Sequence, residues 1–141
     1  MNTILRTFGL CSVLALVAGF IVVVLLSIAT DLILHAAGLL PPLGQRTSNG
    51  LLILATAYRT AYGIAGSYVT ARLAPYQPMQ HALLGGFVGL ILSIAGAIAT
   101  WNRPETFGAH WYPVALVLLA LPTAWAGGRI RLMQLHQEQL A

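Results

Sequence analysis

Residues 51–72, LLILATAYRTAYGIAGSYVTAR, decide the fold because they form an apolar stretch long enough to span a membrane and they contain an arginine, Arg59. A charged side chain inside a bilayer is costly, so it usually faces the interior of a helix bundle or a water-filled cavity and has a partner. Helical periodicity places small and polar residues on the same face as Arg59. They are Ala55, Tyr62, Gly63, Gly66 and Thr70. This pattern predicts a packed bundle of helices built around a buried arginine.

The composition is typical of a membrane protein. The chain has 141 residues, of which 58% are hydrophobic and 7% are charged, whereas charged residues make up about 25% of a typical soluble domain. The basic residues are all arginines, and they are scattered along the chain in ones and twos. No basic stripe that could neutralise phosphates is present, so we expect the lipid bilayer as a partner and no nucleic acid.

The first predicted span is the uncharged segment 7–30, between Arg6 and Asp31. It is longer than the apolar region of a signal peptide, which has about 7–15 residues, so we interpret it as an uncleaved anchor. Because Ser27, Asp31 and His35 are spaced by four and share one helix face, the helix can continue beyond residue 30.

Residues 32–44 are too short for a second span, and two prolines, Pro41 and Pro42, end any helix there. We expect this segment to lie at the membrane interface. The polar stretch 45–50 follows, and Thr47 or Ser48 can cap the next helix.

The remaining sequence predicts further spans at residues 51–72, 81–100 and 113–128, with a C-terminal tail at 129–141. Short connections make neighbouring spans antiparallel. The predicted fold class is therefore all-α: an integral membrane bundle of four antiparallel transmembrane helices that forms one domain over residues 1–141. We expect Pro122 to kink the fourth span.

The third span carries a ridge of small residues at helical spacing, which lets another helix backbone approach closely. Its members are Ala82, Gly85, Gly89, Ser93, Gly96 and Thr100. Together with Gly63 and Gly66 of the second span, these residues are predicted to pack helices. The ridge either packs within one chain or contributes to a homo-oligomer.

A faint internal repeat relates the second and fourth spans. Residues 60–62 are TAY and residues 123–125 are TAW, and each triplet precedes an alanine-glycine pair, at 65–66 and at 126–127. Two repeated helical hairpins would give a parallel repeat about an axis along the membrane normal. Chance similarity between alanine-rich helices is the alternative.

The distribution of arginines predicts the orientation. With the N-terminus inside, four arginines are cytoplasmic and two, Arg46 and Arg103, are outside, which satisfies the positive-inside rule. The cytoplasmic ones are Arg6, Arg72, Arg129 and Arg131. We therefore expect a multi-pass protein of the inner (plasma) membrane with both termini in the cytoplasm.

A polar cluster is expected at the outer face, where Asp31, His35, Glu105 and His110 meet in this topology. Such residues can bind a metal or handle protons. The spacing of known zinc sites is absent and a single cysteine, Cys11, excludes a cysteine-based one. We therefore expect no metal and no cofactor, with these residues solvating helix ends.

Arg59 and Asp31 are predicted to form an ion pair. Asp31 ends the preceding span on the same side of the membrane, and the connection between the two spans is short. Tyr62 or backbone carbonyls would accept or share the remaining hydrogen bonds of the guanidinium group. The alternative is an unpaired Arg59 that lines an anion-attracting cavity.

Three segments resemble a group of uncharacterised small bacterial membrane proteins with four helices. They are TAYGIAGSYVTARLAP (60–75), QHALLGGFVGLILSIAGAIATWN (80–102) and WYPVALVLLALPTAWAGGRIR (111–131). The resemblance covers the second to fourth spans and implies a fold, without an activity.

Two functions follow from these features, and a membrane enzyme is a third, less favoured alternative. The first is a non-enzymatic accessory subunit or self-associating helical scaffold, because no nucleophile elbow, phosphate-binding loop or catalytic carboxylate pair is present. The second is a small oligomeric transporter or channel that uses Arg59. Expected partners are a second copy of the chain or another membrane subunit. A dry, paired Arg59 would favour the first function, and a cavity that reaches one membrane face would favour the second.

Overall fold

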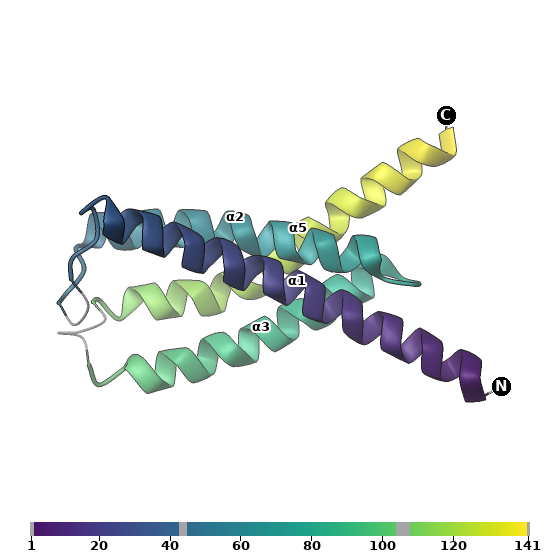
Figure 1. Ribbon diagram of the computed structural model, residues 1–141, viewed down its shortest axis with the longest axis horizontal. Helices are drawn as coiled ribbons and strands as arrows, with labels where there is room; N and C mark the ends of the chain where they lie inside the picture. Colours follow the sequence, from purple (N-terminus) through teal and green to yellow (C-terminus); the bar gives the residue numbers. More distant parts are fainter. Residues whose placement is uncertain (1, 43–44, 104–107, 141) are drawn as a thin grey trace.

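The computed structural model describes residues 2–42, 45–103 and 108–140, and the regular structure in these ranges is entirely helical (Figure 1). The helices are α1 (Asn2–Ala36), α2 (Asn49–Leu73), α3 (Pro78–Thr100) and α5 (Trp111–Leu140). Figure 1 shows both chain ends at one end of the bundle. Residues 37–42 and 45–48, before α2, and residues 101–103 and 108–110, before α5, lie at the other end.

Three of these helices are long and apolar enough to cross a membrane: Gly9–Ala36, Pro78–Thr100 and Trp111–Leu140. The helix expected over residues 51–72 is present as α2, but it is not among the three. Arg59 and several hydroxyl-bearing residues lower its hydropathy. α2 packs against each of the other three helices, and Tyr58, Arg59 and Tyr62 find their polar partners on α1.

Local chemistry explains where the helices begin. Ser48 caps α2, as expected, and its Oγ accepts a hydrogen bond from the Leu51 amide at 3.5 Å. Pro78 occupies the first turn of α3, where the missing amide hydrogen costs nothing. The preceding residue, Gln77, has a φ of 42° in the left-handed region, and this lets the chain reverse within the short 74–77 connection.

Two helices extend further than the expected spans. α1 runs through residues 32–36, which were expected at the interface, because nothing breaks the helix before Gly38 at a φ of 69°. α5 runs to Leu140, so residues 129–140 continue the helix. Figure 1 shows that α5 changes direction, with its first part beside α3 and its C-terminal part rising away from the other helices. Pro122 inside the helix accounts for this bend.

Close helix packing depends on glycines in contact with backbone. An added Cβ at Gly66 would lie 2.6 Å from the Gly19 carbonyl oxygen, and one at Gly127 would lie 2.6 Å from the Ile64 carbonyl oxygen. The first contact joins α1 to α2 and the second joins α2 to α5. Backbones that approach this closely gain van der Waals contact, which stabilises helix pairs in lipid.

Within one chain, the small-residue ridge of α3 packs only in part, and the single chain does not test the predicted homo-oligomer contact. A Cβ at Gly86, one position from the ridge, would clash with the Ala124 side chain of α5. A Cβ at Gly89 or Gly96 would meet nothing within 4 Å, and Gly85 makes only ordinary contact, with Leu16 at 3.5 Å. The helix pair with the fewest contacts among those that pack together is α1 and α3, so this part of the ridge faces a space.

Side-chain burial follows the pattern of helices that meet lipid. The buried apolar residues are small, apart from Leu52, and no large side chain in the described part of the chain is fully buried. Many large apolar side chains are exposed along the helices. Packing therefore depends on shape complementarity of small residues rather than on burial of large ones.

Candidate functional site

Arg59 of α2 forms an ion pair with Asp31 of α1. Its Nη2 donates to Asp31 Oδ2 at 2.8 Å, and the two side chains are 35% and 31% exposed. The hydroxyl of Tyr58 donates to the other carboxylate oxygen, Oδ1. The carboxylate therefore has a donor on each oxygen, and the predicted ion pair is present.

Tyr58 rather than Tyr62 completes this cluster. The Tyr62 hydroxyl instead shares a hydrogen bond with Thr30 Oγ1 at 2.7 Å. The two tyrosines are one helical turn apart, with ring centroids separated by 5.7 Å, so both face α1 and each reaches a different polar group on it. Tyr58 lies outside the small and polar helix face that the sequence pattern defines around Arg59, so that pattern does not predict its role.

The guanidinium of Arg59 has more N–H donors than Asp31 accepts. A guanidinium carries five N–H donors, and Asp31 accepts from Nη2. The Nε atom is buried and has no hydrogen-bond acceptor among the described residues. A buried donor without an acceptor is costly, and because this atom is closed off from solvent, only the remaining Nη donors can meet a further acceptor.

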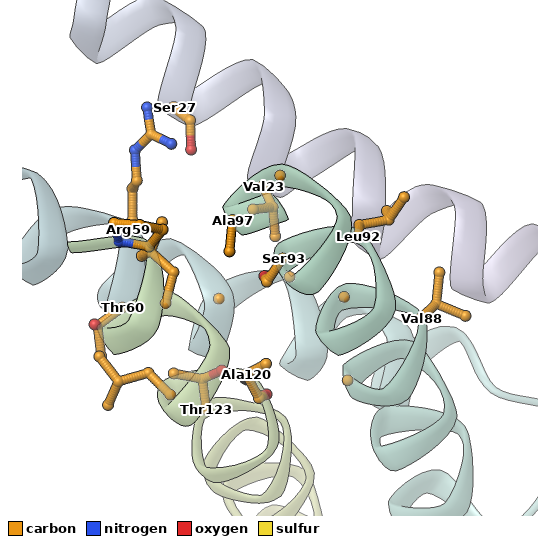
Figure 2. A pocket seen from close by; sticks show the side chains of 18 of the residues that line it. Val23, Ser27, Arg59, Thr60, Val88, Leu92, Ser93, Ala97, Ala120 and Thr123 are labelled. Atoms are coloured by element: carbon orange, nitrogen blue, oxygen red, sulfur yellow. Dashed lines mark hydrogen bonds between the residues drawn. The ribbon is translucent and has the colours of Figure 1, made fainter. Parts of the chain in front are cut away.

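Beside Arg59 lies a cavity of about 650 Å³ whose walls come from all four helices. Figure 2 shows the Arg59 side chain at the edge of the cavity, where it extends toward Ser27 of α1. Thr60 of α2, Ser93 of α3 and Thr123 of α5 lie around the same cavity. Gly89 and Gly96 also line it, which explains why these glycines touch no neighbouring helix. Small side chains on α3 keep the space open.

The cavity extends to the end of the bundle that holds the 101–110 connection. Thr100 ends α3 there, and Gly108, His110 and Tyr112 line the same region. At its other end the cavity reaches Gly66 and Gly85, near the middle of the bundle. It therefore occupies the half of the molecule opposite the chain ends.

One side of the cavity is open between α1 and α3. Phe20 of α1 and Val88 and Leu92 of α3 all line the cavity, yet each is about half exposed at the surface (48%, 49% and 49%). Side chains that border both the cavity and the outer surface form the rim of an opening. This opening faces the apolar sides of the helices.

Arg59 places a cationic group in the cavity wall. No aspartate or glutamate is among the described residues of the lining. The charge of Arg59 is paired with Asp31, which is outside that lining. Arg59 is therefore both paired, as one sequence interpretation predicted, and part of a cavity wall, as the other did.

The expected outer-face cluster does not form one site in the described part of the chain. His35 Nδ1 lies 2.8 Å from the Asp31 carbonyl oxygen of its own helix, and His110 Nε2 lies 2.8 Å from the Trp101 carbonyl oxygen. Glu105 lies outside the described residues. No group of three or more histidine, cysteine, aspartate or glutamate side chains able to hold a metal is found within residues 2–42, 45–103 and 108–140.

Polar contacts at the opposite end of the bundle connect the helices near the chain ends. Buried His81 has its Nε2 2.9 Å from Ser12 Oγ, which ties α3 to α1. Tyr68 donates to Gln134 at 2.9 Å and accepts from Arg72 at 2.9 Å, which ties α2 to α5. These contacts hold the helices together below the cavity.

Comparison of the chain with protein-family models, curated proteins and solved structures finds no match.

Proposed function

We propose that this chain is a small, non-enzymatic integral membrane protein that binds a ligand in its internal cavity, as a small transporter does. The observation that carries this proposal is the 650 Å³ cavity with Arg59 in its wall. Ligand sites are concave, mostly apolar and marked by a few polar groups, and they commonly have volumes of about 300–1,000 Å³. Helix bundles place such sites between their helices.

In the proposed topology four antiparallel helices cross the inner membrane with both termini in the cytoplasm. Support comes from the two chain ends lying at one end of the bundle (Figure 1). That end also carries Arg72, Arg129 and Arg131, and arginines accumulate on the cytoplasmic side. The cavity then opens toward the outer face and, between α1 and α3, toward lipid.

The experiment compares thiol accessibility inside and outside the cavity. In a Cys11→Ala background, Ser93→Cys places a thiol in the cavity wall, and Ile91→Cys places one two residues away on the exposed side of α3. We expect a membrane-impermeant thiol reagent added from outside to modify Ser93→Cys and to leave Ile91→Cys unmodified, because thiolates form only where water reaches.

The second candidate is the helical scaffold or accessory subunit, and the Arg59–Asp31 ion pair favours it. A charge that is paired with a neighbouring helix needs no ligand to explain its presence. This function predicts a dry cavity in the membrane, filled by a partner helix or a second copy. Equal protection of Ser93→Cys and Ile91→Cys would therefore favour the scaffold over the binding protein.

A further inference from the structure

We propose that the ligand of this cavity is an anionic amphiphile with a single hydrocarbon chain. Its acidic headgroup lies beside Arg59, and its chain lies along the glycine-rich wall of α3. This inference rests on the proposed function and specifies the class of ligand.

The dimensions of the cavity favour a long, narrow molecule. Its α3 wall runs from Gly85 to Thr100, which corresponds to about 22 Å of helix at 1.5 Å per residue. A volume of about 650 Å³ spread over this length leaves room for one chain rather than for a compact, bulky solute. Gly89 and Gly96 provide the space that larger side chains would fill.

Most of the wall is apolar, and its polar groups include the hydroxyls of Ser27, Ser67 and Ser93 beside those of two threonines. The hydroxyl of Thr60 donates to the Thr56 carbonyl at 2.7 Å, and that of Thr123 donates to the Ala120 carbonyl at 3.0 Å. Both are committed to their own helices, which leaves methyl groups and aliphatic side chains such as Leu92 and Leu119 for the ligand. A hydrocarbon chain is stabilised in such surroundings, whereas an extended polar molecule loses its hydrogen bonds to water.

The guanidinium of Arg59 in the cavity wall defines the headgroup. Asp31 accepts from one Nη atom of Arg59, and no carboxylate from the described residues lines the cavity. Tyr112 and His110 line the same outer region. A carboxylate or phosphate group would satisfy the arginine with a charge-assisted hydrogen bond, which is stronger than a neutral one.

The opening between α1 and α3 provides the route of access. Its rim consists of Phe20, Val88 and Leu92, all apolar and half exposed. An amphiphile dissolved in the bilayer can pass its chain sideways between these residues, while its charged headgroup reaches Arg59 through the outer end of the cavity. A water-soluble anion would not enter through an apolar opening that faces lipid.

Photolabelling with chain-matched probes tests the inference. The purified protein is incubated with a long-chain fatty acid that carries a photoactivatable diazirine near the end of its chain, or with the corresponding fatty alcohol, and labelled residues are identified by mass spectrometry. We expect the acid to label cavity residues near Gly89, and the alcohol to label them about ten-fold less, because it lacks the charge that Arg59 recognises.

Two variants separate charge from shape. Arg59→Gln should reduce labelling by the acid about ten-fold and leave labelling by the alcohol unchanged. Arg72→Gln, at the inner end of the same helix and outside the cavity lining, is its control.

Gly89→Leu should reduce labelling by both probes, because its Cβ projects into open space and its side chain fills the cavity without a clash. Gly9→Leu, also without a neighbour within 4 Å and outside the cavity lining, is the matched control.

The outcomes distinguish the inference from the function on which it rests. Equal labelling by acid and alcohol in the unaltered protein would overturn the headgroup assignment and leave the binding cavity in place. Displacement of the acid by inorganic phosphate or butyrate at equal concentration would overturn the need for a chain. Displacement by a lysophospholipid supports a lipid source, and displacement by unlabelled fatty acid alone supports a free acid. If the fatty acid labels no cavity residue although the Ser93→Cys thiol reacts with the impermeant reagent, only the ligand class is overturned.

Discussion

At the scale of single residues, Arg59 combines two roles because its guanidinium has more donors than one carboxylate can accept. Asp31 and Tyr58 fix the cation in place, while the Arg59 side chain also lines the cavity. An ion pair that also orients the arginine costs less inside a membrane than a free charge. The pair therefore serves the binding function that we propose.

The ion pair predicts coupled stability effects. We expect Asp31→Asn and Arg59→Gln each to lower the free energy of unfolding by about 1–2 kcal/mol, and the double variant to lose about 1 kcal/mol less than their sum, as pairs in membrane proteins do. The effect is modest because the side chains are 35% and 31% exposed and solvent screens them. Reversible unfolding in mixed micelles measures it, and strict additivity would show that the pair does not stabilise the fold.

Sequence reasoning found Asp31 because acids are rare in this chain and the nearest one ends the neighbouring helix. It could not find Tyr58. Which of two tyrosines reaches the carboxylate depends on how α1 rotates against α2, and that rotation is set by the contact between Gly19 and Gly66. A periodic pattern within one helix contains no information about this contact.

At the scale of helices, the glycines divide into those that pack and those that leave space. Gly66 and Gly127 touch the backbone of a neighbouring helix, whereas Gly89 and Gly96 touch nothing. The sequence predicted helix packing at all small residues of the α3 ridge, because spacing identifies a face but not what lies opposite. Where α1 and α3 separate, the same face becomes a cavity wall.

This division predicts opposite effects of one substitution. Gly66→Leu should abolish the folded protein, because its Cβ would lie 2.6 Å from the Gly19 carbonyl oxygen and overpacking of this kind forces the backbones apart. Gly89→Leu should keep the folded protein and its elution volume. Size-exclusion chromatography in detergent compares them, and loss of both variants would place Gly89 in a helix contact.

At the scale of the whole molecule, the position of α2 decides the topology. α2 is 25 residues long, which gives about 38 Å at 1.5 Å per residue, enough for a hydrocarbon core of about 30 Å. It is not among the three helices that are apolar enough to cross a membrane, and it lies against all three. Because Arg59 and the tyrosines find partners on α1, α2 can cross the membrane without exposing their polar groups to lipid.

Reporter fusions distinguish this arrangement from one in which only the three apolar helices span. With four spans, fusions after Arg46 and Arg103 should read as periplasmic, and those after Gln77 and Ala141 as cytoplasmic. If α2 stays outside the bilayer, fusions after residues 46 and 77 must lie on the same side, and the C-terminus must lie opposite the N-terminus. That result would also place Arg59 outside the membrane. It would then contradict both a membrane-embedded ion pair and an acid-binding cavity beside Arg59.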